Sequence, residues 1–365
     1  MHMQITPDWP VWATRLPADS TQTRRAEGGK RLQQQACGGV RQSRPLISYI
    51  TVVRNAERTI ARTLQSVQAQ RGPAVEHILL DGLSTDSTLA VIEAHAAQID
   101  YYASEADGGL YEALNKAIPL ARGELICVLN ADDWLSADAA QSMARAYEKA
   151  GQPDAVLMLS AAWALKRKGS GLSRRLWLPT ALNRAAYLRC ANICHNGVYA
   201  TRSAYARTGP YATNLPVAAD FKWLMQGVDA GVPTLSVDKP TVHYAPGGLS
   251  SNLQQHTQDC AAVLADRFPF LSSDEVWGLM HAFHRFRGNM LHFADRRPAD
   301  MQSFLNVLAQ RHATHPDLLA TLALAQTGAE QTWAYKLSRG WRKLRVYLPF
   351  YLRGGQTALR LKGEP

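Results

Sequence analysis

Two short segments place carboxylates directly after runs of apolar residues. In one of them, Asn130, Asp132 and Asp133 follow the apolar run 126–129. In the other, Asp81 follows an apolar run and precedes a tight polar turn. Carboxylates at the end of a buried strand are typical ligands of a hard divalent cation, which in turn binds the phosphates of a nucleotide. Together the two segments indicate a metal-assisted nucleotide site.

The elements that must position these groups alternate between strand and helix patterns. Apolar runs predict strands at 46–53, 75–80, 99–103, 124–129 and 155–159, and helical spacing predicts helices at 60–70, 84–95, 110–121 and 138–150. This alternation favours an α/β fold with a mostly parallel sheet flanked by helices. Ligands of such sheets bind beyond the carboxyl ends of the strands. The polar residues expected at those ends are Asn55, Asp81, Asp107 and Asp132.

The chain has 365 residues and a formal net charge of +10. It contains no run of about eighteen apolar residues, so the sequence predicts no bilayer-spanning helix. Five cysteines without a paired framework fit a reducing compartment. We expect a flexible leader over 1–44, a nucleotide-binding α/β domain over 45–250, a C-terminal helical extension over 251–332 and a basic aromatic tail over 333–365.

The tail carries eight basic residues and one acidic residue, which gives it a net charge of +7. Its bases are interleaved with aromatic residues such as Trp341, Tyr347 and Phe350. This mixture predicts a helix that lies in the interface of an anionic membrane. The alternative is a solvated basic face whose aromatic residues pack on the protein, and charge alone is equally compatible with nucleic acid.

The order of these motifs resembles that of family 2 glycosyltransferases, which are inverting enzymes with the GT-A (Rossmann-like) fold. The matching segments are 50–57, 81–86, 104–117, 129–133, 195–196, 219–220 and 247–250. The likeness is greatest to bacterial enzymes of O-antigen, capsule and exopolysaccharide assembly. It implies a hexosyltransferase-type enzyme that moves a sugar from a nucleotide-sugar donor to a hydroxyl of a lipid-linked or growing glycan acceptor. UDP is the commonest donor base in similar enzymes. A cytoplasmic protein, peripheral at the inner face of the cytoplasmic membrane, is implied as well.

In this family a D-x-D motif holds the metal, and the segment 130–133 stands in its place. We expect Asp132 and Asp133 to ligate Mg²⁺ or Mn²⁺, because all-oxygen ligands suit both ions. The first acid of the motif is Asn130 here, whose amide can hydrogen-bond a ribose hydroxyl or metal-bound water but contributes no charge. His243 is expected to complete the metal shell, as a late histidine does in some GT-A enzymes. A capped helix start and a structural histidine are the alternatives.

For the donor, the resemblance makes Asp81 the partner of the nucleobase N–H, with an Asx-turn as the alternative. Lys116 is expected to face phosphate, unless it is an exposed helical lysine. The family's usual aromatic before Asn55 is Arg54 here, so we expect no base stacking from that position. The remaining expected donor-binding residues are Thr51, Val53, Asn55, Glu57, Asp107 and Asn115.

Attack of an acceptor hydroxyl on the anomeric carbon requires a base that takes the hydroxyl proton. Asp220 opens an amphipathic helix at the place where the family has its base, and the alternative role is an N-cap of that helix. His195 and Asn196 are expected to position the acceptor.

Other function classes stay open at this point. A sugar nucleotidyltransferase also combines a nucleotide-binding sheet with metal carboxylates, but it usually has a glycine-rich basic loop after the first strand, where this chain has residues 54–57 without glycine. A basic nucleic-acid-binding protein would use the positive charge, yet the basic tail is separate from the acidic crevice. We therefore expect no nucleic-acid partner. Asn130 also leaves open an inactive relative that binds donor without transferring it.

Overall fold

The structure is a computed structural model that describes residues 9–17, 24–36, 46–70, 72–168, 171–245, 247–248, 251–327, 333–352 and 358–359. Eleven strands form one sheet at its centre, with the main order β1-β4-β3-β2-β5-β9-β7-β10-β6. The strands are β1 (Ala26–Gly28), β2 (Ile47–Val53), β3 (Val75–Asp81), β4 (Tyr101–Ser104), β5 (Leu125–Val128), β6 (Trp134–Leu135), β7 (Leu157–Lys168), β8 (Gly171–Trp177), β9 (Val198–Thr201), β10 (Thr234–Tyr244) and β11 (Ala358–Leu359).

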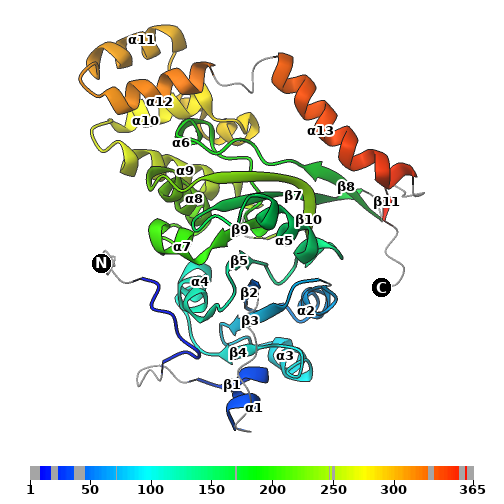
Figure 1. Cartoon of the computed structure of the whole chain (residues 1–365). Helices are drawn as coiled ribbons and strands as arrows, with labels where there is room; N and C mark the ends of the chain where they lie inside the picture. The colour runs from blue at the N-terminus through cyan, green and yellow to red at the C-terminus, as the bar shows by residue number, and fades with distance from the viewer. Residues whose placement is uncertain are drawn as a thin grey trace.

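Helices flank this sheet and continue beyond it (Figure 1). The α-helices are α1 (Lys30–Ala36), α2 (Ile60–Gln68), α3 (Thr88–Ala94), α4 (Leu110–Ala117), α5 (Ala139–Lys149), α6 (Ala186–Arg189), α7 (Arg202–Thr208), α8 (Ala219–Asp229), α9 (Leu253–Arg267), α10 (Ser273–Phe283), α11 (Met301–Arg311), α12 (Pro316–Thr327) and α13 (Trp333–Leu352). Three 3₁₀ segments, η1 (Ile118–Leu120), η2 (His195–Gly197) and η4 (Arg287–Arg296), complete the set of labelled elements.

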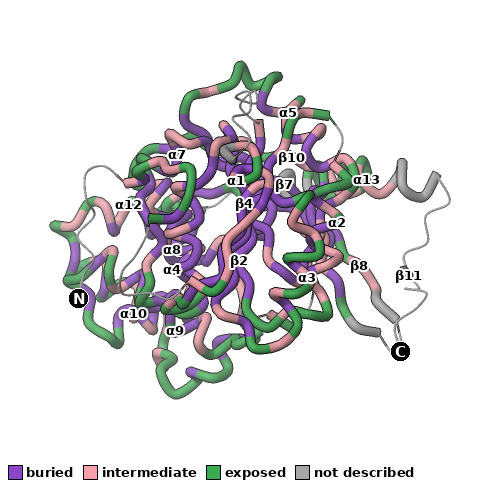
Figure 2. The backbone as a smooth tube through the Cα atoms, turned by 90° about the horizontal axis from the view of Figure 1, so that it is seen from below, coloured by how far each residue is buried: buried purple, intermediate pink, exposed green. Residues whose placement is uncertain are grey.

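The central strands β4, β3, β2 and β5 are parallel to one another, as the β/α alternation predicts. Every residue of β2 is buried, because helices cover both faces of a parallel sheet. Figure 2 shows the same pattern, with buried residues in the strands and exposed residues on the surrounding helices and loops. The predicted α/β class is confirmed, and the carboxyl ends of β2, β3 and β5 come to one edge.

Beyond β5 the sheet becomes mixed. β9 pairs antiparallel with both β5 and β7, and β10 then pairs parallel with β7. The segment 160–215 supplies most of the β7–β8 hairpin, β9 and α7. β10 is one strand with register shifts on either side of Pro240.

The expected flexible leader is wrong for residues 9–17 and 24–36. β1 pairs antiparallel with β4 and extends the sheet by one strand. Arg31 of α1 is only 3% exposed and forms an ion pair with Glu76 at 2.6 Å. These segments pack on the sheet because a buried ion pair and strand pairing fix them there. The rest of 1–44 lies outside the described residues.

The helices α9–α12 lie at the opposite end of the sheet from β1 and α1 in Figure 1. They share one hydrophobic core with α6 and α8, through residues such as Leu264, Leu279 and Trp223. The predicted helical extension therefore packs directly on the α/β part of the chain. Among the described residues, no helix combines the length and the hydropathy needed to cross a bilayer.

Candidate functional site

A cavity of about 680 Å³ opens at the carboxyl ends of β2 and β5. Its volume is within the range of small-molecule sites, and its position is the one expected for a ligand of a parallel sheet. Eight of the predicted site residues line it: Val53, Asn55, Glu57, Asn130, Asp132, His195, Asn196 and Asp220. The structure thus brings the candidate metal ligand Asp132 and the candidate base Asp220 to one cavity.

The loop after β5 turns its two carboxylates in different directions. The Asp132 side chain is half-buried in the cavity wall, and burial raises the pKa of its carboxyl group. Asp133 is 1% exposed and is not among the residues lining the cavity. Its Oδ1 accepts the Ala245 N–H at 2.6 Å, and its Oδ2 accepts the Asn196 side-chain amide. Burial and the neighbouring Asp132 raise the pKa of Asp133 well above its usual range. Asp133 therefore connects three loops, and its role as a metal ligand stays a prediction.

Helix α2 holds this loop from behind. The Thr63 hydroxyl donates to the carbonyl oxygens of Ala131 and Asp133, at 2.9 and 2.7 Å. The Arg62 guanidinium donates to the Asp132 carbonyl at 3.0 Å and lies 3.8 Å over the Trp134 ring. The backbone that presents Asp132 is therefore fixed by two side chains of one helix, neither of which the sequence motifs indicated.

Asp220 is the second residue of α8 and faces the cavity from the opposite side of the fold. Its Oδ1 accepts the Phe221 N–H at 2.7 Å and lies 3.5 Å from the Tyr111 hydroxyl. That hydroxyl donates to the Val217 carbonyl at 2.9 Å. Asp259 of α9 accepts the N–H groups of Val217 and Ala218, which orders the turn that leads into α8.

His195 and Asn196 lie in η2 and line the same cavity as Asp132 and Asp220. The His195 Nε2 and the Tyr211 hydroxyl are 2.9 Å apart. Burial lowers the pKa of His195, so its imidazole is neutral near pH 7. A neutral, anchored imidazole is suited to hydrogen-bonding a sugar hydroxyl.

The loops after β2 and β3 are joined by side-chain hydrogen bonds. Asn55 has a φ of 53°, in the left-handed region where asparagine is among the tolerated residues, and its Oδ1 accepts the Thr85 N–H at 2.8 Å. The Glu57 carboxylate accepts the Ser87 N–H at 3.0 Å. Asp86 accepts the Glu57 N–H at 3.2 Å and also lines the cavity. These bonds shape the side of the cavity nearest β3.

Asp81 is 1% exposed and does not belong to the cavity lining. Its carboxylate accepts hydrogen bonds from the Ser84 N–H at 3.2 Å and the Ser104 hydroxyl at 2.5 Å, and Arg25 lies 3.5 Å away. The Ser84 hydroxyl also donates to Asp81, and its oxygen accepts the Asn55 N–H at 2.8 Å. The Asx-turn alternative therefore describes this geometry. Asp81 does not reach the cavity itself and is connected through Ser84 to Asn55, which lines it.

Five further predicted residues lie outside the cavity lining. Thr51 is fully buried, with its hydroxyl 2.9 Å from the His77 Nε2. Asn115 exchanges two hydrogen bonds of 2.8 Å with the backbone of Tyr211. These bonds engage the side-chain polar atoms of Thr51 and Asn115 within the protein, and contact of the two residues with the donor stays a prediction.

Lys116 and Asp107 also have partners within the protein. Lys116 donates to the Ala106 carbonyl at 3.1 Å and pairs with Glu112 at 3.2 Å. Asp107 accepts the Gly109 N–H at 2.9 Å, and burial raises the pKa of its carboxyl group.

His243 stacks on Trp134 with 5.0 Å between ring centroids, and burial is the main cause that lowers its pKa to about 4. It pairs with Trp134 across β10 and β6, and the structure does not bring it into the lining. The expectation that it completes the metal shell is not supported by this position.

Several lining residues come from parts of the chain where the sequence offered no motif. They are Trp177, Ala191, Ile193, Tyr244, His256 and Phe286. Trp177 and Tyr244 end β8 and β10, Ala191 and Ile193 follow α6, Phe286 follows α10, and His256 belongs to α9. No local sequence pattern indicated that these residues line the cavity.

The sequence and the fold were compared with known proteins. Residues 48–195 match the profile of glycosyl transferase family 2. The chain is 30% identical over 191 residues to the uncharacterized glycosyltransferase MT1564 of Mycobacterium tuberculosis (strain CDC 1551 / Oshkosh), which covers 50% of this chain and 69% of that protein. It is 28% identical over 187 residues to the PGL/p-HBAD biosynthesis glycosyltransferase of Mycobacterium bovis (strain BCG / Pasteur 1173P2), covering 48% and 67%.

Among solved structures, S. aureus TarS 1–349 in complex with UDP-GlcNAc superposes with a TM-score of 0.50 at 18% identity, covering 67% of this chain and 75% of that one. The chain spans 50% of the longer TarS chain. This likeness concerns the fold.

Proposed function

This chain belongs to glycosyl transferase family 2, and we propose that it transfers a sugar from a nucleotide-sugar donor to a hydroxyl group of a lipid-linked or growing glycan acceptor, with inversion at the anomeric carbon. The observation that carries the proposal is the presence of Asp132 and Asp220 around one cavity. A carboxylate for a cation and a carboxylate for a proton are the two groups that such a transfer requires. Family membership also decides against a sugar nucleotidyltransferase.

Asp220 is the proposed general base. The hydrogen bond from the Phe221 N–H fixes the side-chain orientation at the start of α8, with the carboxylate among the residues lining the cavity. A carboxylate in this position can accept the proton of a bound hydroxyl group. As the acceptor oxygen bonds to the anomeric carbon and the nucleoside diphosphate leaves, the hydroxyl proton passes to Asp220.

The residues around Asp132 fit a divalent cation. Burial raises the pKa of this carboxyl group, so a neighbouring positive charge would stabilise its ionised form. The Asn130 side chain lines the same part of the cavity, and carboxylate and amide oxygens suit Mg²⁺ or Mn²⁺. When bound, such an ion neutralises charge that develops on the departing diphosphate. Asp133 supports this role indirectly, because it fixes the loop that carries Asp132.

Donor recognition is proposed for the loops after β2 and β3. Asn55 and Glu57 line the cavity, and hydrogen bonds from their side chains to the β3 loop hold them in place. Asp81 acts behind them, since Ser84 connects it to the Asn55 backbone. We therefore assign Asp81 to positioning the nucleotide loop. His195 and Asn196 line the cavity together with Asp132 and Asp220, which suits contacts with the acceptor.

A membrane-bound acceptor is supported by α13. This helix docks on the sheet through Arg342, which donates to Asp238 at 2.8 and 2.9 Å, and through Tyr347, whose hydroxyl accepts the Leu176 N–H at 2.9 Å. Val346 packs on the same hydrophobic cluster of β7 and β8. At 100° per residue these three residues lie on one half of the helix.

The other half of α13 exposes a stripe of large apolar side chains. Leu337, Trp341 and Leu344 recur at helical spacing and are 63%, 64% and 48% exposed. Between residues 333 and 352 the sequence has five basic residues and no acidic one. An apolar stripe with a tryptophan and flanking bases is typical of a helix lying on an anionic membrane surface. We propose that this face places the cavity near lipid-linked acceptors.

The experiment that tests the catalytic proposal begins with the donor. The full chain is screened by thermal shift against a panel of nucleotide sugars with Mn²⁺, starting with UDP-sugars, the class that the family resemblance implies. Sugar transfer to a lipid-linked acceptor is then measured for Asp220→Asn and for the matched control Asp266→Asn, an exposed carboxylate on α9.

We expect Asp220→Asn to lower turnover by about 10²–10⁴-fold while keeping the donor-induced thermal shift, and Asp266→Asn to behave as the parent. Normal turnover in Asp220→Asn would remove this residue from the base role. Metal-independent, salt-sensitive binding of DNA would instead support a nucleic-acid function.

A further inference from the structure

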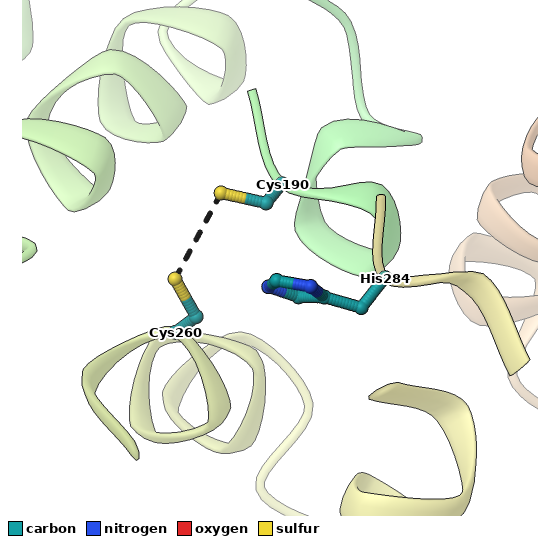
Figure 3. A group of neighbouring side chains, drawn as sticks. All are labelled: Cys190, Cys260 and His284. Carbon is teal, nitrogen blue, oxygen red and sulfur yellow. Dashed lines mark hydrogen bonds between the residues drawn. The ribbon is translucent and has the colours of Figure 1, made fainter. Parts of the chain in front are cut away.

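Three metal-binding side chains from distant parts of the chain meet next to the cavity (Figure 3). Cys190 directly follows α6, Cys260 lies in α9 and His284 directly follows α10. Their exposed fractions are 4%, 1% and 1%, and one ligand atom from each lies within 4.8 Å of the other two. The His284 ring is directed toward the two sulfur atoms in Figure 3.

The spacing of these atoms matches a tetrahedral metal site. The two Sγ atoms are 3.9 Å apart. Two sulfur ligands of zinc lie about 3.8 Å apart when each Zn–S bond is about 2.3 Å and the angle is tetrahedral. A disulfide would require the sulfurs to approach to about 2.05 Å. A weak hydrogen bond between two thiols accounts for the same distance, so the sulfurs alone do not decide.

The imidazole of His284 supplies a second observation. Its Nε2 is buried and has no hydrogen-bond partner among the described residues. A buried polar nitrogen without a partner is costly, and a cation is one of the few groups that would satisfy it beside two sulfurs. Metal ligation through Nε2 leaves the ring proton on Nδ1. A protonated Nδ1 cannot accept the Phe286 N–H, which donates to it at 3.2 Å in this structure. This hydrogen bond must therefore break when the metal binds, so the metal-bound chain should differ at Phe286.

A candidate for a fourth ligand lies one helical turn before Cys260, outside the three residues whose ligand atoms are all within 4.8 Å of one another. His256 of α9 has its Nδ1 3.8 Å from the Cys260 Sγ, and it lines the cavity. Residues at i and i+4 of a helix lie on the same face, which suits two ligands of one ion. Two thiolates and two imidazoles form a set that prefers zinc to the hard ions Mg²⁺ and Mn²⁺.

We propose that Cys190, Cys260 and His284, with His256 as the fourth ligand, bind a structural zinc ion that fixes the wall of the cavity. Ala191 and Phe286, neighbours of two of these residues in the chain, line the cavity, as does His256 itself. Asp259, next to Cys260, holds the turn before α8 through the N–H groups of Val217 and Ala218. The ion thereby orders the three segments that face Asp220. The binding of zinc itself does not depend on the proposed function.

The first test is the metal content of the full chain, purified under reducing conditions from zinc-supplemented cells. Plasma mass spectrometry should find about one zinc per chain. A strong chelator should lower Tm, and added Zn²⁺ should restore it. Replacement by Co²⁺ should give the near-ultraviolet absorption of a thiolate-bound cobalt. A chain that lacks zinc, with a Tm insensitive to both chelator and Zn²⁺, would overturn the proposal.

Variants separate this site from the rest of the molecule. Cys190→Ser and Cys260→Ser should lose the zinc, whereas Cys127→Ser, a buried cysteine of β5, should keep it. Asp132→Asn should also keep the zinc. Zinc content therefore tests the zinc site independently of whether the catalytic proposal is correct. If Cys190→Ser is too unstable to purify, the cobalt spectrum and chelator response of the parent chain decide. Zinc retained in a folded Cys260→Ser, or a Cys190–Cys260 disulfide found by mass spectrometry under reducing conditions, would contradict the site.

Discussion

Two adjacent carboxylates of the loop after β5 have opposite surroundings. Asp132 faces the cavity, and Asp133 accepts hydrogen bonds from the Ala245 N–H and the Asn196 amide. Both partners of Asp133 are donors, so the site accepts only a side chain with two acceptor oxygens. This difference separates a residue that acts on the ligand from one that holds the loop.

The substitution Asp133→Asn tests this separation. The new amide must place its NH₂ group against one of the two N–H donors, which leaves buried donors without acceptors. We expect a loss of about 1–3 kcal/mol in the free energy of unfolding, together with a loss of Mn²⁺ binding. Asp132→Asn is the control, since it should lose Mn²⁺ binding while keeping the stability of the parent. Equal stability of the two variants in urea titrations would show that Asp133 does not hold the loop.

A buried histidine predicts how stability depends on pH. Burial, with Lys30 nearby, lowers the pKa of His77 from 6.5 to about 3. As pH falls below about 6.5 the unfolded chain takes up a proton that the folded chain binds only near pH 3. The folded state therefore loses stability through this window as pH falls, by at most about 1.4 kcal/mol per pH unit from this residue.

His77→Gln removes the titrating group and keeps a polar atom for the Thr51 hydroxyl. Stability measured in urea between pH 7 and pH 5 should fall less steeply for this variant than for the parent. The exposed His292→Gln serves as the control for the substitution itself. A slope for His77→Gln equal to that of the parent would mean that His77 is not the proton-linked group.

At the level of single residues, the sequence could indicate that Asp81 and Asp132 lie at the carboxyl ends of two strands, because apolar runs followed by an acid are visible in one dimension. It could not distinguish their surroundings. Asp81 is enclosed by Ser84, Ser104 and Arg25, and the last two come from segments distant in sequence. Such enclosure depends on which strands pair, and no local pattern carries that information.

At the level of elements, α2 does more than cover the sheet. Its Thr63 and Arg62 hold the backbone of the loop that presents Asp132. The helix and the loop are about seventy residues apart in sequence and adjacent in space, because β2 and β5 are neighbours in the parallel sheet.

Thr63→Val removes the hydroxyl and keeps the shape of the side chain. The carbonyl oxygens of Ala131 and Asp133 lose a donor, and we expect the free energy of unfolding to fall by about 1–3 kcal/mol and Mn²⁺ affinity to weaken. Isothermal titration with Mn²⁺ and urea unfolding measure the two effects. Gln65→Ala, on the exposed face of the same helix, should change neither. Parent-like Mn²⁺ affinity in Thr63→Val would show that α2 does not position the metal loop.

The elements from β2 to α5, apart from η1 and the two-residue strand β6, could be predicted from the sequence because each repeats a local period: apolar runs for strands, and spacing of three to four residues for helices. The insertion of β9 between β5 and β7 could not, since its four residues pair with strands far away in the chain. β1 was missed for the same reason, as a three-residue strand has no periodicity and depends on β4 for its place.

At the level of the whole molecule, two sets of segments line the cavity. The loops after β2, β3 and β5 supply the residues proposed to bind the donor, and α8, α9 and the segment after α10 supply further lining residues. The sequence could indicate the first set through its motifs. The second set consists of residues such as His256 and Phe286, whose position follows only from the packing of the helical extension on α6 and α8.

The proposed orientation of the molecule at a membrane rests on the two faces of α13. One face is attached to β8 and β10 through Tyr347 and Arg342, so the opposite face has a fixed direction relative to the sheet. Leu337→Glu combined with Trp341→Glu places charges on that exposed face. Burial of each such side chain is worth about 1.5–3 kcal/mol, so binding to phosphatidylglycerol vesicles should weaken about tenfold per substitution. Stability should stay unchanged, because both side chains are exposed.

Vesicle co-sedimentation of the full chain at low and high salt measures this effect. The matched control is Leu291→Glu, at another exposed leucine, which is 77% exposed in η4 and should bind vesicles as the parent does. Because the bases of α13 attract anionic lipid, high salt should weaken the parent's binding, and neutral phosphatidylcholine vesicles should bind it less than phosphatidylglycerol vesicles do. Equal binding by the double variant and the parent would show that the exposed stripe of α13 is not the membrane-facing surface, and absence of binding by the parent would contradict membrane association through this helix.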